Sequence, residues 1–315
     1  NQVLDEAILK AKNLDNIIPT YLSYEVTKYE IIDKDNNFVK AKEFNIRPIP
    51  TFLEAPARML KTIKDKKEAK SLYQEVKKSE LYDNVFKFYK TSVDLSKESP
   101  EIGRIEAFTK GWLERESNFL HMTYKYIYSL LVSGLYDEFY EEIKTNYTCF
   151  MDPDVYGRSP IENSSFIAPS NNPDERKHGQ GFVARLSGST AEMLSMWSHM
   201  FFGPNLFKYK DGKLVFEINP KLSKEFFINK KVTTKLFSSI NVEIINNDLV
   251  DTYDDKSYVE KIILVDLNKE EHEFSGNQVV GQWALKIRQK LIYKIKVIIS
   301  KEEKKWNYKR DCSYS

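Results

Sequence analysis

Apolar residues recur at the spacing of an α-helix in much of the chain before residue 204. This periodicity predicts helices over residues 56–64, 68–78, 116–134 and 136–147. Gly134 stands where a glycine commonly ends a helix. Ser187 or Ser189 is placed to cap a further helix that runs to Phe202, and Glu192 follows Ser189 at capping-box spacing. This part of the chain is therefore predicted to be mainly helical.

Two other stretches carry strand patterns. In residues 20–39, tyrosine, valine and isoleucine flank the polar run Asp33-Lys34-Asp35-Asn36-Asn37, which predicts a hairpin. After Gly203-Pro204 the composition changes, and short segments separated by Asn, Asp, Lys and Gly predict an antiparallel β-sandwich or jelly roll. These β-rich segments lie at residues 213–218, 235–245, 258–267 and 291–299.

The change of pattern near residue 204 divides the chain. We expect an α+β multidomain protein with a helical domain over residues 1–204, a β-sandwich domain over residues 205–300 and a charged tail over residues 301–315. The 315 residues, 41% of them hydrophobic, suffice for a sizeable core in such an arrangement.

Charge and cysteine content limit the possible functions. The 48 basic and 46 acidic residues give a net charge of +2 without a dominant basic block, so we expect no nucleic-acid partner. No apolar run is long enough to predict a membrane span. The two distant cysteines, Cys149 and Cys312, form no disulfide framework and fit a cytoplasmic location. Aromatic residues reach 13%, which suits stacking on sugars but equally fits a coding sequence rich in A and T.

Three segments contain most of the polar chemistry. Residues 108–122 include a histidine, His121, at the start of an apolar helical pattern, and residues 152–165 are dense in carboxylates, amides and aromatics. Residues 178–190 contain Ser187-Gly188-Ser189 at the predicted start of a helix, where free backbone N–H groups can bind an anion. Together they suggest a polar pocket for a sugar and an oxyanion.

These segments resemble the C-terminal part of cellobiose-phosphorylase-like enzymes, in or near glycoside hydrolase family 94. Phe119-Leu120-His121 is similar to the Phe-Cys-His-like motif of that family, with Leu in place of Cys. Leu186-Ser187-Gly188-Ser189, which begins 65 residues after His121, is similar to the family's Thr-Gly pair, with Ser in place of Thr. The resemblance extends over about residues 50–290 and is strongest over residues 101–203.

The resemblance implies both a fold and an activity. The helical domain would contribute the C-terminal helices of an (α/α)6 barrel, followed by the β-sandwich domain. The activity would be reversible, inverting phosphorolysis of a β-linked disaccharide or oligosaccharide to a sugar 1-phosphate. Inorganic phosphate would be the co-substrate, no other cofactor is expected, and a homodimer is possible.

One part of the family pattern is missing. The general acid of the family is an Asp in a Trp- and Asp-rich stretch well upstream of the histidine, and this chain has no such stretch. We therefore expect none of its residues to be the catalytic acid, and we expect the chain to be the C-terminal part of a larger enzyme. A glycoside hydrolase on the same barrel, or a non-catalytic carbohydrate-binding remnant of a split gene, remain alternatives.

The resemblance assigns site residues. His121, Ser187 and Gly188 would bind phosphate, with His178 as a second candidate. The sugar would be bound by Trp112, Glu114, Glu116, Glu162 and Asn163. Each has an ordinary structural explanation: a histidine in the core, a serine that caps a helix, a carboxylate on the surface or an aromatic side chain in the core. The four histidines are isolated in sequence, so we expect no metal site.

Overall fold

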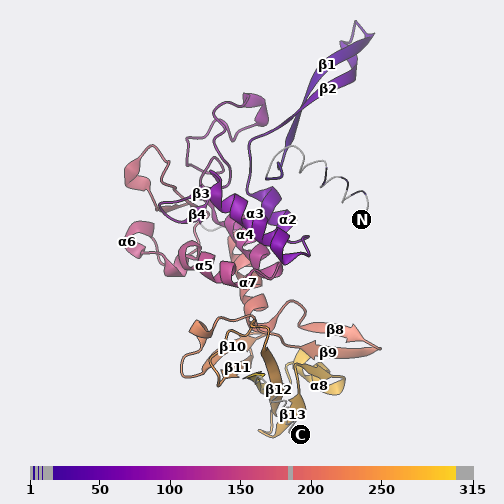
Figure 1. Ribbon diagram of the computed structural model, residues 1–315, viewed down its shortest axis with the longest axis vertical. Helices are drawn as coiled ribbons and strands as arrows, with labels where there is room; N and C mark the ends of the chain where they lie inside the picture. Colours follow the sequence, from indigo (N-terminus) through magenta and orange to yellow (C-terminus); the bar gives the residue numbers. More distant parts are fainter. Residues whose placement is uncertain (1–2, 4–5, 7–8, 10–16, 184–186, 303–315) are drawn as a thin grey trace, which may run out of the picture. The chain divides into compact units, whose positions relative to one another are not determined.

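The computed structural model describes the chain except for residues 1–2, 4–5, 7–8, 10–16, 184–186 and 303–315 (Figure 1). Most of the predicted charged tail, residues 301–315, therefore lies outside the described residues. The chain divides into two compact units, an N-terminal unit of residues 1–196 and a C-terminal unit of residues 197–315. The protein is a mixed α+β chain with several small sheets, and the described residues contain no closed barrel of helices.

The helices of the N-terminal unit agree closely with the helical periodicity. They are α2 (Glu54–Leu60), α3 (Lys66–Lys78), α4 (Leu120–Val132), α5 (Tyr136–Asn146), the short α6 (Pro153–Tyr156) and the start of α7 (Ser187–Phe202). Helix α4 packs against α2 and α5, because its apolar side chains point to the core on nearly all sides. Ile127, Leu130 and Leu131 are fully buried there.

The start of α4 differs from the prediction. Periodicity extended this helix back to residue 116, but it begins at Leu120. Leu113 and Glu116 have φ angles of 52° and 57°, which a right-handed helix does not allow. The chain instead makes a tight turn and then forms a two-residue strand, β5 (Asn118–Phe119), before entering the helix.

This short strand brings three distant segments together. Strand β5 pairs with β6 (Phe166–Ile167), which pairs with β7 (Gly181–Phe182), both antiparallel. Phe119 is opposite Phe166, and Phe166 is opposite Phe182. The sheet therefore fixes the residues before α4 beside the two ends of the long loop that leads to α7.

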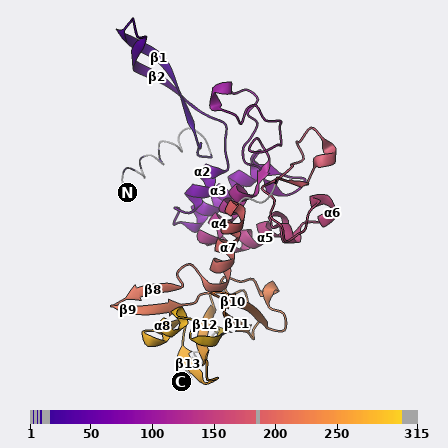
Figure 2. The same ribbon diagram turned by 180° about the vertical axis from the view of Figure 1, so that it is seen from behind.

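Two further pairs of strands belong to this unit. Strands β3 (Tyr82–Asp83) and β4 (Phe88–Tyr89) form a small hairpin between α3 and the 111–116 turn. Strands β1 (Leu22–Asp33) and β2 (Phe38–Pro48) form a long one, as predicted. In both views the latter is a two-stranded ribbon (Figures 1 and 2).

The C-terminal unit is built on a five-stranded sheet of order β10-β11-β15-β12-β13. Its strands are β10 (Lys231–Leu236), β11 (Ile240–Asn246), β12 (Ser257–Asp266), β13 (Glu271–Ser275) and β15 (Ile292–Lys301). A second sheet of order β14-β9-β8 contains β8 (Phe207–Lys210), β9 (Lys213–Glu217) and β14 (Gln278–Val280). Helix α8 (Gln282–Arg288) contacts β9 and β14.

One pair of strands departs from the expected antiparallel arrangement. Strands β11 and β15 are parallel, with Val242 opposite Ile295 and Ile244 opposite Val297. Two other strands of the sheet, then β14 and α8, come between them in the chain, so the connection is long enough to return in the same direction. The expectation of a purely antiparallel domain is wrong for this pair, and the jelly roll and the (α/α)6 barrel remain predictions.

Candidate functional site

An aromatic stack on one face of the β5-β6-β7 sheet organises the candidate site. Because Phe119, Phe166 and Phe182 are cross-strand partners, their rings share a face. Ring centroids are 4.6 Å apart for Phe119 and Phe166 and 5.4 Å apart for Phe166 and Phe182. Trp112 stacks on the outer side of Phe182 at 3.8 Å, and His121 meets the edge of Phe119 at 5.8 Å. The stack therefore connects an expected sugar-binding residue to an expected phosphate-binding one.

His121 lies directly against Gly188. The histidine is the second residue of α4, and the glycine is the second residue of α7. A Cβ atom on residue 188 would overlap Nδ1, Cε1 and Cγ of the imidazole, so only glycine allows this approach. Two residues that are distant in the sequence are thus in contact.

The surroundings of His121 favour its neutral form. Partial burial lowers the pKa of the imidazole, and the charge of Lys125 lowers it further, while the charge of Glu192 on α7 opposes both. His121 Nε2 is 3.8 Å from Glu192 Oε1. The capping-box interpretation of Glu192 missed this contact, because it depends on how the two helices meet.

Helix α7 begins at Ser187, so Gly188 lies in its first turn. The first N–H groups of a helix have no partner within it and carry the positive end of the helix dipole. The side chain of Ser187 lies outside what the structure describes. At this end of α7, the neighbouring imidazole and the free amides could together donate hydrogen bonds to an anion.

Glu116 is held in the tight turn before β5. It is 1% exposed, and its Oε2 accepts a hydrogen bond from Asn171 Nδ2 at 2.7 Å and lies 3.5 Å from Lys110 Nζ. Burial raises the pKa of this carboxyl, against the lowering effect of Lys110 and Lys90. Glu116 Oε1 has no hydrogen-bond partner among the described residues. Asn171 was not foreseen, because only folding brings its loop to the turn.

Trp112 and Glu114 lie in the same turn but are less deeply buried. Glu114 Oε1 accepts a hydrogen bond from Arg104 Nη2 at 3.1 Å, and its side chain remains about one-third exposed. Trp112 is partly buried by its stack on Phe182. Both side chains can therefore be reached from solvent, unlike Glu116.

Glu162 and Asn163 have different surroundings from each other. Glu162 is half-exposed and pairs with Arg158 Nη1 at 2.7 Å. Asn163 is buried, and its Oδ1 accepts hydrogen bonds from Tyr124 OH at 2.9 Å and from Thr148 Oγ1 at 3.1 Å. These contacts give Asn163 a structural role, connecting α4 to the loop that precedes α7.

His178 has a different partner from His121. Its Nε2 is 2.7 Å from the carbonyl oxygen of Asn172, whose Nδ2 donates to the carbonyl oxygen of Gly111 at 3.1 Å. A Cβ atom on residue 111 would press on Asn172 at 3.0 Å, so this contact is tight. His178 thus helps to fix the long loop against the 111–116 turn.

A cavity of about 260 Å³ opens elsewhere in the N-terminal unit. It is mostly apolar and is lined by Phe86, Phe88, Val155, Ile167 and Gly179 among others. None of the expected site residues lines it. The candidate site therefore rests on the side-chain arrangement around His121 and Trp112, not on this cavity.

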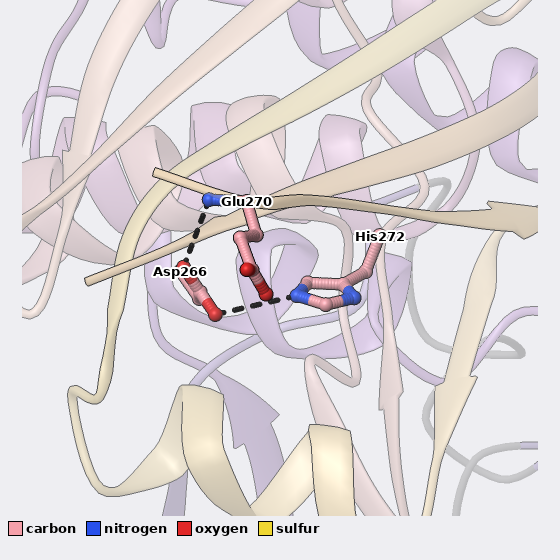
Figure 3. Close-up of side chains that lie close together, drawn as sticks. All are labelled: Asp266, Glu270 and His272. Carbon is pink, nitrogen blue, oxygen red and sulfur yellow. Dashed lines mark hydrogen bonds and ion pairs between the residues drawn. The ribbon is translucent and has the colours of Figure 1, made fainter. Parts of the chain in front are cut away.

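The C-terminal unit contains a group that the isolated histidines of the sequence did not suggest. Asp266, Glu270 and His272 place possible metal-ligating atoms within 4.8 Å of one another (Figure 3). Asp266 Oδ2 is 3.3 Å from His272 Nε2, and its Oδ1 accepts from the backbone N–H of Glu270 at 3.0 Å. The aspartate thus caps the turn between β12 and β13, which accounts for the arrangement without an ion.

Comparison with known proteins adds no assignment. Neither the models of known protein families nor the curated proteins include a match to this chain. In the described part of the chain, every helix is too short or too polar to cross a bilayer.

Proposed function

We propose that the chain carries the phosphate-binding half of an inverting β-glucoside phosphorylase site. The contact between His121 and Gly188 at the start of α7 carries the proposal. Phosphate needs several donors directed at one point, and an imidazole beside free helix N–H groups supplies them. The spacing of these two residues in the sequence and their contact in space are independent observations that agree.

The neighbouring aromatic stack supports a sugar next to this anion. Trp112, at the far end of the stack, offers a partly exposed ring, and Glu114 beside it offers an accessible carboxylate for sugar hydroxyl groups. Glu162 would add a second carboxylate. Glu116 and Asn163, being buried, would position the turn and the loop without touching the sugar.

The proposed reaction needs one carboxylic acid and no base. A phosphate oxygen forms a bond to the anomeric carbon while the glycosidic bond breaks, and the acid protonates the leaving sugar. Phosphate is already an anionic nucleophile, whereas an inverting hydrolase needs a second carboxylate to activate water. By the resemblance, the acid lies outside this chain, in a larger cytoplasmic enzyme.

Thermal unfolding with and without inorganic phosphate tests the proposal. A ligand that binds only the folded protein raises the midpoint by mass action, so millimolar phosphate should raise that of the unmodified chain. The shift should disappear in His121→Ala. It should persist in His272→Ala, which removes a histidine of the C-terminal unit, and chloride at matched ionic strength should give no shift.

Equal phosphate shifts in His121→Ala and in the unmodified protein would overturn the assignment of this site. A folded, unmodified protein with no shift in phosphate would favour the non-catalytic alternative instead. Adding a β-linked disaccharide in each case separates sugar binding, which that alternative retains, from phosphate binding.

A further inference from the structure

The hairpin of β1 and β2 carries an apolar face that the described chain leaves uncovered. The register places Tyr24 opposite Ile46 and Val26 opposite Phe44, and the rings of Tyr24 and Phe44 meet edge to face at 6.3 Å. These four side chains therefore share one face. All four are about half-exposed.

The apolar face continues toward the turn. The ladder is irregular around the Lys28–Glu43 pair, where one residue of each strand is left out of the pairing. An extra residue in both strands keeps the register but reverses the alternation of side chains. Tyr29 and Ile31, with their partners Ala41 and Val39, thereby join the face of Tyr24 and Val26.

The opposite face of the hairpin is polar and balanced in charge. Lys28 Nζ lies 3.0 Å from Glu43 Oε1, and Lys42 Nζ lies 2.6 Å from Glu30 Oε2. Glu25 and its partner Asn45 lie on this face as well. Such a face is stable in water, so the asymmetry between the two faces calls for a partner on the apolar one only.

The base of the hairpin is tied to the N-terminal unit. Arg47 forms two hydrogen bonds to the carboxylate of Glu98, at 2.9 and 2.7 Å. Tyr21 packs edge to face on Phe52 at 5.3 Å, and Thr20 Oγ1 donates to the carbonyl oxygen of Phe52. The apolar face is thus presented in a fixed geometry, which lowers the entropic cost of binding.

The exposed area matches what a stable dimer requires. The large side chains of the apolar face (Tyr24, Val26, Tyr29, Ile31, Val39, Phe44 and Ile46) leave roughly 800 Å² in contact with water, about the share that one partner contributes to a standard interface. That is also more than the apolar patch of a typical monomer.

We propose that two copies of this chain associate through the apolar faces of their hairpins. The face carries no charge that would select a different partner, and a two-fold axis brings the same flat surface to itself. Two such ribbons stack face to face at about 10 Å, as the sheets of a β-sandwich do. The dimer contact does not depend on the proposed function.

Sedimentation velocity of the full chain over a range of concentrations tests the dimer. We expect the mass of two chains for the unmodified protein at micromolar concentration. The double variant Val26→Lys/Phe44→Glu puts an opposite-charge cross-strand pair on the apolar face, which preserves the hairpin but opposes its burial. It should raise the dissociation midpoint on the order of 100-fold. Glu25→Lys/Asn45→Glu makes the matching change one register step away on the polar face and should leave the midpoint unchanged.

A mass of one chain for the unmodified protein at every concentration would overturn the proposal, as would equal midpoints for the two double variants. Hydrogen exchange of the unmodified protein gives a test that needs no variant. Protection of residues 22–33 and 38–48 should rise with concentration. A dimer whose hairpin exchange is independent of concentration would place the contact elsewhere and reject this surface.

Discussion

His121 and Gly188 occupy the same small space at the junction of α4 and α7, because the ring of the first fills the volume that a side chain on the second would need. Nothing in the conformation of residue 188 itself demands glycine, since it lies in a regular helix without a positive φ. The requirement comes from the histidine. This distinction leads to a test in which the usual effect of a glycine substitution is reversed.

Gly188→Ala should destabilise the protein. In an unhindered helix the change would stabilise by about 0.5–1 kcal/mol, but here the added methyl must displace His121, at a cost of about 1–3 kcal/mol. Denaturant unfolding measures the balance, and the phosphate-dependent shift of the midpoint should fall as the imidazole moves.

The control is Ser195→Ala at an exposed position of the same helix, where stability should change by less than about 0.5 kcal/mol. A stabilising effect of Gly188→Ala would show that His121 moves freely and is not held by this contact.

Phe166 is the middle ring of the aromatic stack, so its removal should have a large effect. It is 4% exposed and contacts the rings of Phe119 and Phe182. Phe166→Ala should cost about 3–5 kcal/mol in the free energy of unfolding of the N-terminal unit. Phe150→Ala, at a position that is 54% exposed, should cost less than about 1 kcal/mol and serves as the control. Similar losses in both variants would argue against a stack that organises the site.

The sequence predicted the elements whose residues repeat over several turns or pleats. Helices α3, α4 and α5 and the β1–β2 hairpin follow from apolar spacing, because their faces differ consistently in burial. Strands of two residues, such as β5, β6 and β7, have no period to detect. The positive φ angles of Leu113 and Glu116 have no signal either, since neither residue favours them.

The candidate site was predictable only in part, for a related reason. The pairing of His121 with Gly188 followed from motifs at a fixed separation, but the neighbours of each residue depend on tertiary packing. Asn163 looked like a sugar ligand in the sequence and is instead bonded to Tyr124 in the interior. Glu116 looked accessible and is buried against Asn171. Burial of a polar residue in a loop cannot be derived from local pattern.

Replacing Glu116 should change the pH dependence of stability in a defined direction. Burial raises the pKa of its carboxyl above the ordinary 4.5, so the folded state holds the proton to higher pH than the unfolded chain does. The stability that this group contributes is present below pH 4.5 and is lost as pH rises through the folded pKa. Glu116→Gln should therefore gain stability relative to the unmodified protein between about pH 4.5 and pH 8, measured by denaturant unfolding. A gap that widens in the opposite direction would mean that Lys110 and Lys90 outweigh burial.

His199 should make the C-terminal unit sensitive to acid. This residue is 6% exposed, and burial first, then the charge of Lys221, lowers its pKa from 6.5 to about 4. The unfolded chain therefore takes up a proton at a higher pH than the folded one. The stability held by the neutral imidazole is complete above pH 6.5 and is lost as pH falls toward 4, by on the order of 3 kcal/mol. His199→Gln should remove this part of the pH dependence.

The comparison is best made as the difference in unfolding free energy between the two proteins at pH 7, 5.5 and 4, because carboxylates that titrate in the same range then cancel. Lys221→Gln provides an independent check, since removing its charge should raise the pKa of His199 and reduce the loss between pH 6.5 and 4. A difference between the unmodified protein and His199→Gln that stays constant across this range would mean that the imidazole takes up its proton in the folded state as readily as in the unfolded chain. The neutral, buried form of His199 would then not be what holds this unit together at neutral pH.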